Sequence, residues 1–373
     1  MAAEEYLTAA EAAAFLGVSR PTLYAYVSRG LVASEATDGR SRRYPRRALE
    51  AFRARRDAPR EPAAWAATES AVSLIDGERL WYRGVDAREL SRTATVEETA
   101  ALLWDGPVDV FPARASHGRA RRGSFVERLV ACLVRERDRH PLSLAERDDS
   151  TLRVAAETVT ALFEAAGARG DGPLHERLAR GWELEDGETL RAALVLCADH
   201  GLSASTFTAR TVASTDAPLP NALLAALCAL EGRRHGGVAT GEIADLLDDV
   251  ARRGARRACE RVLAQRGRLP GFFGTTSVYR GGDPRAIEVL ARLRLPRRDA
   301  GAQTIGYARA FGGTPSIELA LAAFARRAEL ARDAPFAIFA LGRSIGWIAH
   351  AFEAAASGVL IRPRATYVGP RPR

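Results

Sequence analysis

The chain has 373 residues, 47% of them hydrophobic, and this length predicts two or three domains with a substantial core. Its net charge of +8 is the difference between 54 basic and 46 acidic residues. All 54 basic residues are arginine, a bias typical of a GC-rich coding sequence, so the net charge does not establish a nucleic-acid partner. The acidic start "MAAEEYLTAAE" lacks the features of a signal peptide, and no run of about 18 apolar residues occurs, so we expect a cytoplasmic protein without membrane contact.

Alanine-rich amphipathic runs dominate the chain, for example "TLRVAAETVTALFEAA" and "SIELALAAFARRAELA". Their apolar residues recur at helical spacing, and alternating patterns are scarce, so a mostly α fold is predicted. Four cysteines are widely spaced without a C-x-x-C pair, which indicates buried free thiols and no metal site. They are Cys132, Cys197, Cys228 and Cys259.

The first sixty residues contain two short helical patterns. Thr8 and Glu11 form a capping box for a helix that ends at Leu16, while Ser19 and Pro21 begin a second helix that runs to about residue 29. This is the spacing of a helix-turn-helix. The segment "DGRSRRYPRRALEAF" then predicts a hairpin tip followed by another helix.

Polar side chains of this segment are candidates for contact with nucleic acid. Packing of the two helices leaves Arg20, Thr22 and Tyr24 available for a groove or for phosphates. Arg42 and Arg43 lie at the hairpin tip, where they are expected to contact phosphates.

The pattern "LT..EAA..LGVS..TLY.YV..GL" with a basic stretch before "RRY" resembles the winged helix-turn-helix of MerR and excisionase-type proteins over about residues 5–56. The resemblance implies a domain at residues 1–57 that binds duplex DNA. Residues 58–67, charged and proline-bearing, are expected to be a linker. A small helical subdomain without DNA contacts remains the alternative.

The rest of the chain carries motifs in which His, Arg or carboxylate residues stand beside glycine or at a helix edge. The blocks "SLIDGE…YRG", "DHG…STF", "HGG", "GDPRA", "GR..GWIAH" and "RPR..YVGP" resemble the citrate synthase family from about residue 68 to residue 373. The resemblance implies an all-α, two-domain homodimer, with a small subdomain inserted at roughly residues 230–330.

Four arginines and one histidine match ligand-binding positions of that family. The resemblance implies that His200, Arg285 and Arg343 hold oxaloacetate, that Arg362 reaches into the neighbouring subunit's site, and that Arg280 binds phosphates of coenzyme A. Planar guanidinium groups suit a dicarboxylate, because each can donate two charge-assisted hydrogen bonds to one carboxylate.

The resemblance also implies a Claisen-type condensation with acetyl-CoA or another short acyl-CoA as co-substrate and no permanently bound cofactor. His235 matches the histidine that stabilises the enol oxygen, and Glu318 stands where the family has an aspartate base. The histidine that polarises the ketone falls on Thr276, or on Thr275 when the register is counted from the other side. Loss of such a donor costs about 100- to 1000-fold in rate, so efficient ordinary citrate synthesis is not expected.

Two functions therefore remain open. One is an acyltransferase that joins an acyl-CoA to oxaloacetate or a related 2-oxo acid. The other is a DNA-binding regulator whose degenerate synthase domain senses a dicarboxylate or an acyl-CoA. A dimerising scaffold without a ligand is disfavoured, since four ligand-type arginines would then match by accident.

Overall fold

The structure is a computed structural model. It describes residues 6–28, 32–36, 42–57, 69–112, 123–141, 149–273, 278–279, 281–363 and 369. The chain divides into two compact units, unit 1 (Met1–Thr68 with Arg364–Arg373) and unit 2 (Glu69–Pro363).

Unit 1 is a small helical unit with one short sheet. Its elements are β1 (Tyr6–Leu7), α1 (Ala9–Leu16), α2 (Arg20–Ser28), β2 (Glu35–Ala36), β3 (Arg42–Pro45) and α3 (Arg46–Asp57). The strands are antiparallel in the order β1-β3-β2. The Thr8–Glu11 capping box is present and confirms the predicted start of α1, and Gly17, with φ of 63°, ends that helix. Leu16, Leu23 and Tyr44 are buried in the core of this unit.

Unit 2 is helical, so the predicted mostly α fold is confirmed. It begins with a three-stranded antiparallel sheet of order β4-β5-β6. The elements are β4 (Ser73–Asp76), β5 (Arg79–Tyr82), β6 (Val85–Asp86), α4 (Ala87–Thr93), α5 (Val96–Trp104), η1 (Val108–Val110), α6 (Phe125–Arg139), α7 (Asp149–Ala166), α8 (Leu174–Gly181), α9 (Gly187–Cys197), α10 (Ala204–Ala213), α11 (Leu219–Leu230), α12 (Gly236–Arg253), α13 (Ala255–Arg266), β7 (Phe272–Phe273), α14 (Pro284–Leu293), α15 (Ala300–Arg309), β8 (Thr314–Pro315), α16 (Ile317–Arg327) and α17 (Ala334–Ala356).

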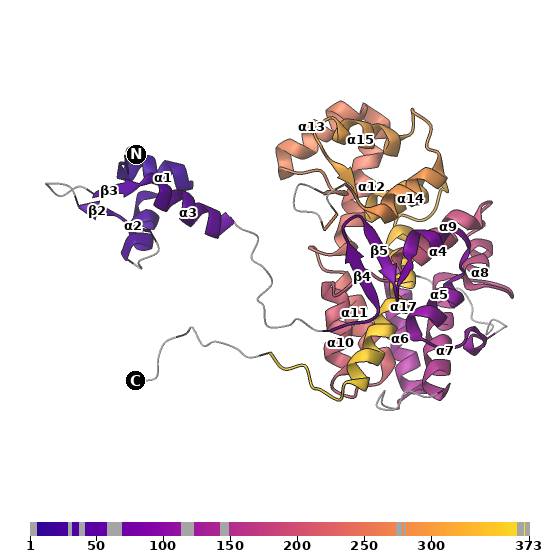
Figure 1. Ribbon diagram of the computed structural model, residues 1–373. Helices are drawn as coiled ribbons and strands as arrows, with labels where there is room; N and C mark the ends of the chain where they lie inside the picture. The colour runs from indigo at the N-terminus through magenta and orange to yellow at the C-terminus, as the bar shows by residue number, and fades with distance from the viewer. Residues whose placement is uncertain are drawn as a thin grey trace. The chain divides into compact units, whose positions relative to one another are not determined.

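Helix α17 runs through the centre of unit 2, with α9, α10 and α11 packed against it (Figure 1). Two glycines let α17 approach α9 closely. A Cβ atom at Gly342 would come within 2.6 Å of the Leu194 carbonyl oxygen, and one at Gly346 would meet the Ala198 carbonyl, which accepts a hydrogen bond from the Gly346 N–H at 3.0 Å. This close packing brings Arg343, between the two glycines, to the end of α9.

A second, smaller core lies apart from the main one. It is formed by α12, α13 and α15 with one side of α16, and Figure 1 shows α12, α13, α14 and α15 grouped at one end of unit 2. Cys132, Cys197 and Cys259 are buried free thiols as predicted, but the expectation is wrong for Cys228, which is exposed. Cys228 lies on the outward side of α11, whose other side buries Leu223 and Leu227.

Candidate functional site

Four of the residues singled out in the sequence come together in unit 2. His200 follows α9, His235 precedes α12, Arg285 lies in the first turn of α14, and Arg343 lies in the middle of α17. Burial is the largest cause of the lowered pKa of His200, His235 and Arg343, and charges within the cluster add to it. Arg343 lowers the pKa of both histidines, and Arg285 lowers that of His200 and of Arg343. We call this cluster the candidate site.

Arg343 is a buried cation with spare hydrogen-bonding capacity. Its side chain is 1% exposed, its Nε donates to the Cys197 carbonyl at 2.8 Å, and its guanidinium lies 4.8 Å from the ring centre of Phe339. Its buried Nη2 has no hydrogen-bond partner among the described residues. Burial lowers the pKa of Arg343, while the nearby Asp199 carboxylate raises it. A buried guanidinium nitrogen without a partner favours the binding of an anion.

Arg285 is held rigidly by Asp283. Its Nε and Nη2 donate to the two oxygens of the Asp283 carboxylate at 2.9 and 2.8 Å. Burial lowers the pKa of Arg285, but the Asp283 carboxylate outweighs burial and the pKa is raised. Asp283 also accepts a hydrogen bond from the backbone N–H of Ile317 at 3.2 Å, which ties the start of α14 to the start of α16.

His200 makes one side-chain hydrogen bond, between its Nε2 and the hydroxyl of Tyr279 at 2.9 Å. Burial, followed by the charges of Arg285 and Arg343, lowers the pKa of His200 well below its ordinary value of 6.5. The imidazole is therefore neutral at pH 7, with one N–H to donate.

The tautomer of His235 is fixed by Ser205. The Ser205 backbone N–H, which can only donate, lies 3.4 Å from His235 Nε2, and the Ser205 hydroxyl lies 3.0 Å from the same nitrogen. That hydroxyl in turn accepts from Trp347 Nε1 at 3.2 Å. Burial, with a contribution from Arg343, lowers the pKa of His235 to about 4. His235 is thus a neutral imidazole with its proton on Nδ1.

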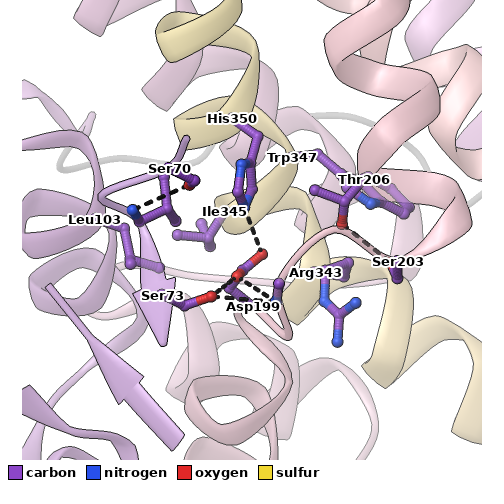
Figure 2. Close-up of polar contacts among 12 residues, drawn as sticks. Ser70, Ser73, Leu103, Asp199, Ser203, Thr206, Arg343, Ile345, Trp347 and His350 are labelled. Atoms are coloured by element: carbon purple, nitrogen blue, oxygen red, sulfur yellow. Dashed lines mark hydrogen bonds and ion pairs between the residues drawn. The ribbon is translucent and has the colours of Figure 1, made fainter. Parts of the chain in front are cut away.

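A buried row of acidic and basic side chains extends from the end of α9, namely Asp199, His350, Glu353 and Arg210. Figure 2 shows Asp199 between Ser73 and His350, with the Ser73 hydroxyl donating to Asp199 Oδ2. Asp199 Oδ1 lies 3.4 Å from His350 Nε2, and Arg210 Nη1 donates to Glu353 Oε2 at 2.6 Å beside His350 Nδ1. Burial lowers the pKa of His350, but Asp199 and then Glu353 outweigh it, so this pKa is raised.

Glu353 also holds the first residues of unit 2. Its Oε1 accepts from the Ala71 backbone N–H at 2.7 Å, and its Oε2 accepts from the Ser70 hydroxyl at 2.8 Å. Burial raises the pKa of Glu353, but its hydrogen bonds to His350, Ala71 and Ser70 prevail and lower the pKa to about 2. The carboxylate is therefore ionised in the folded protein at any ordinary pH.

Glu318 lies in the first turn of α16 and is half-buried. Among the described residues it makes no hydrogen bond or ion pair that would occupy its carboxylate. Glu318 lies near the end of α9, because its charge contributes to the pKa of the Cys197 thiol there. Burial raises that pKa to about 12, the charges of Arg285 and Arg343 oppose the increase, and the charge of Glu318 adds to it. The carboxylate thus lies close to the candidate site.

Several residues predicted for the site are not placed with the cluster. Thr275, Thr276 and Arg280 lie outside the described residues, so their predicted roles stay predictions. Arg362 is described and exposed, six residues beyond the end of α17, and its predicted role in a neighbouring subunit also stays a prediction.

The predicted DNA-reading side chains of α2 differ in exposure. Arg20 begins the helix and is exposed, and Tyr24 is 51% exposed. Thr22 is half-buried, and its hydroxyl lies 2.8 Å from that of Ser19, which caps the helix by accepting from the Thr22 N–H at 3.3 Å. Arg20 and Tyr24 are therefore open to a ligand, whereas Thr22 is engaged in capping.

The two arginines of β3 are exposed but not equally free. Arg42 Nη1 donates to the Ser34 hydroxyl at 3.0 Å. Arg43 donates from Nε and Nη2 to one oxygen of Glu35 at 3.0 and 2.8 Å, and its guanidinium lies 4.1 Å from the ring centre of Tyr6. A phosphate at Arg43 would have to compete with the Glu35 carboxylate.

The described part of the chain contains neither a cluster of metal ligands nor a membrane-spanning helix. No group of three or more His, Cys, Asp or Glu side chains there is arranged to hold a metal ion. No helix there is long and apolar enough to cross a membrane.

The sequence reasoning missed five residues of the site, namely Asp199, Ser205, Tyr279, Trp347 and His350. A signal existed for two of them, because Arg343, Trp347 and His350 follow one another at helical spacing and so share a face of α17. Asp199 and Ser205 stand in the quoted block "DHG…STF", but the block itself indicates no role for them. The contacts of Ser205 and Tyr279 could not be predicted, because their partners lie 30 and 79 residues away in the chain.

Both parts of the chain resemble known proteins. The family model described as citrate synthase, C-terminal domain, matches residues 63–117 and 124–364, and a helix-turn-helix domain model matches residues 6–57. A Mycobacterium tuberculosis protein provisionally named citrate synthase 2 is 34% identical over 347 residues, which cover 82% of this chain and 91% of the relative. The 2-methylcitrate synthase of the same organism is 28% identical, with 78% and 84% of the two chains covered.

A solved structure has the same fold. The crystal structure of citrate synthase from Thermotoga maritima superposes with a TM-score of 0.66 at 25% identity, covering 84% of this chain and 96% of that one. The class defined by fold and site is therefore that of a condensing enzyme with an N-terminal helix-turn-helix domain. The chain belongs to the citrate synthase family.

Proposed function

We propose that unit 2 condenses a short acyl-CoA, such as acetyl-CoA, with oxaloacetate or a related 2-oxo acid. The observation that carries this proposal is the buried guanidinium of Arg343, whose Nη2 lacks a partner among the described residues and which is coupled to Arg285, His200 and His235. Two fixed cations beside two neutral imidazoles suit a ligand that carries carboxylates and a carbonyl group.

Each side chain has a defined task in this reaction. Arg343 and Arg285 bind the carboxylates of the 2-oxo acid, and the neutral His200 donates a hydrogen bond to the same ligand. Glu318 accepts a proton from the carbon next to the thioester, and His235 donates from Nδ1 to the enol oxygen that forms. The enol carbon then bonds to the ketone carbon, and the ketone oxygen takes up a proton to become an alcohol. Water finally hydrolyses the thioester of this condensed product, which gives a carboxylate and releases coenzyme A as the free thiol.

Turnover is expected to be slow in this chain. No histidine occurs between Gly271 and Arg285, so the ketone oxygen lacks the electrophile that the family resemblance implies. A threonine hydroxyl is a neutral donor on a short side chain, and loss of one preorganised donor costs about 100- to 1000-fold in rate.

Free-thiol release from acetyl-CoA tests this function directly. The purified full-length chain is incubated with acetyl-CoA and oxaloacetate, and a His235→Ala variant serves as the control. We expect release that depends on oxaloacetate and is lost in the variant. Release at equal rates in both proteins, or none in either, would refute the enzymatic function.

A second candidate function is a regulator in which unit 1 binds duplex DNA while unit 2 senses a dicarboxylate or acyl-CoA. The exposed Arg20 and Tyr24 on α2, together with the missing histidine of unit 2, favour it. Selection from a random duplex pool at low salt, with and without oxaloacetate and acetyl-CoA, is the test. Enrichment of a two-part site supports it, and an unenriched pool counts against it.

Both functions need a homodimer in this proposal. A pair of helix-turn-helix units would match two half-sites on DNA, and the exposed Arg362 would complete the ligand site of the other subunit. Arg280 would hold phosphates of coenzyme A.

A further inference from the structure

We infer that Tyr279 is a positioning residue that holds His200 in the tautomer whose Nδ1–H points to the oxo-acid ligand. The inference deepens the proposed function of unit 2 and rests on it. It adds a residue to the candidate site that neither the sequence motifs nor the comparisons assign.

The contact between the two side chains is short and shielded from water. The Tyr279 hydroxyl lies 2.9 Å from His200 Nε2, and the two ring centres are 5.5 Å apart with a 59° angle between the planes. Tyr279 is 2% exposed. Solvent therefore does not compete effectively for this hydrogen bond.

The chain segment that carries Tyr279 is fixed at points beyond the tyrosine itself. Two residues later, the Gly281 N–H donates to Glu78 Oε1 at 2.7 Å, and Glu78 lies in the turn between β4 and β5. Two residues further, Asp283 binds Arg285 and the Ile317 N–H. The backbone that follows Tyr279 is thus fixed, and its ring is buried, so a phenylalanine should occupy the same place without the hydroxyl.

The direction of the hydrogen bond follows from the acidity and basicity of the two neutral groups. Burial, followed by the charges of Arg285 and Arg343, lowers the pKa of His200, so the imidazole is neutral, and burial raises the pKa of Tyr279, so the phenol keeps its proton. A phenol O–H is a strong donor, and a neutral imidazole nitrogen is a good acceptor. The hydroxyl therefore donates to Nε2, which leaves the imidazole proton on Nδ1.

Nδ1 is the atom left for a ligand. Among the described residues, no side chain or backbone group forms a hydrogen bond with His200 Nδ1. His235 is held in the same tautomer by Ser205, so the site presents two neutral Nδ1–H donors fixed by different partners. Because the segment from Gly271 to Arg285 contains no histidine, His200 gains importance as a donor to the oxo acid.

Nitrogen-15 NMR of histidine-labelled full-length protein tests the tautomer without any need for turnover. The chain has six histidines, and a His200→Gln variant identifies the His200 signals. We expect His200 to show the neutral Nδ1–H pattern from pH 6 to 8 in the wild type. Tyr279→Phe should shift the pattern toward the Nε2–H form, whereas Tyr307→Phe, at a tyrosine that packs on Phe311 in the smaller core, should leave it unchanged.

Binding of oxaloacetate is the second measurement, by calorimetry on the same proteins. Loss of one neutral hydrogen bond that orients a donor should weaken binding in Tyr279→Phe by about three- to tenfold, with Tyr307→Phe equal to the wild type. An unchanged tautomer or an unchanged dissociation constant in Tyr279→Phe overturns the inference. Failure of thiol release by the wild type, with both of these shifts present, overturns the enzymatic function and not the role of Tyr279.

Discussion

Asp199 Oδ1 lies 3.4 Å from Nε2 of His350 in the interior of unit 2, and both side chains are at most 1% exposed. The pKa of Asp199 is lowered, because His350 and Arg343 outweigh the opposing effect of burial, while that of His350 is raised by Asp199 and Glu353. Each partner therefore stabilises the charged form of the other, in the residue directly before His200 and in the helix beside it.

Stability should depend on pH through His350. Its pKa is raised in the folded state, so its stabilising contribution is complete below the unfolded value of 6.5 and is lost as pH rises through the folded pKa. Asp199 and Glu353 act oppositely, since their contribution is lost only in acid, for Glu353 near pH 2. Urea unfolding should show the stability difference between wild type and His350→Gln shrinking as pH rises above 6.5. A difference that stays constant to pH 9 would contradict this.

Arg343→Met should separate stability from ligand binding. The substitution leaves the Cys197 carbonyl without its donor and the Asp199 carboxylate without one of its neighbouring cations, so the free energy of unfolding without ligand is expected to fall by about 1–3 kcal/mol. The same change should abolish stabilisation of the protein by oxaloacetate. Thermal unfolding with and without oxaloacetate measures both effects, and retained ligand stabilisation would mean that Arg343 does not bind the carboxylate.

Glu318→Gln should stop turnover while leaving oxaloacetate affinity within about twofold of the wild type. The reason is that Glu318 acts in the transition state of proton transfer and does not contribute to the binding of oxaloacetate. The amide cannot accept the proton that the carboxylate takes up. Thiol release and calorimetry report the two quantities. Equal thiol-release rates in variant and wild type would show that another group is the base. Glu329→Gln, at an exposed residue two positions beyond the end of α16, is the matched control.

Complementation should reveal whether Arg362 acts across a dimer. Arg362→Ala and His235→Ala are each expected to be inactive, and their co-expressed mixture should regain about one quarter of wild-type activity. Random pairing makes half of the dimers mixed, and each mixed dimer has one intact site. A mixture as inactive as its components would place Arg362 in its own subunit's site or outside any site.

DNA binding by unit 1 should depend on salt through a few arginines. Arg20→Ala or Arg42→Ala should each weaken binding to all sequences and reduce the slope of log affinity against log salt by about 1. Arg43→Ala should have a smaller effect, because Arg43 already pairs with Glu35. Tyr24→Ala should alter sequence preference instead. Filter binding over a salt series provides the measurement, with Arg256→Ala in unit 2 as the control.

The predictable parts of the molecule are those fixed by neighbouring residues. The capping box of Thr8 and Glu11 acts within one helical turn, and α2 ends at Ser28, one residue from the predicted end. Glycine and arginine motifs of unit 2 were likewise readable, because each occupies a short continuous stretch. The grouping of Arg343 with His200 follows from the Gly342 and Gly346 contacts with α9, which only the packed helices reveal.

The unpredicted parts depend on contacts between distant segments. The side chain of Arg43 is bound to Glu35, because the two residues are paired across β2 and β3. The sequence alone leaves this register undefined. The exposure of Cys228 was missed because α11 is apolar on nearly every side, so its periodicity does not distinguish the outward face. Tyr279 was overlooked because its partner His200 lies 79 residues away in the chain.

The hydrogen bonds of the Glu353 carboxylate to Ser70 and Ala71 have an evolutionary consequence. The first residues of unit 2 are anchored by a carboxylate of its own central helix, so the chain that precedes them can be exchanged without loosening the sheet that follows. A protease cut before residue 69 should release an intact unit 2. At the level of the gene, this anchor makes the amino end of the unit a junction where a foreign module can be joined or lost by recombination at little cost to the fold.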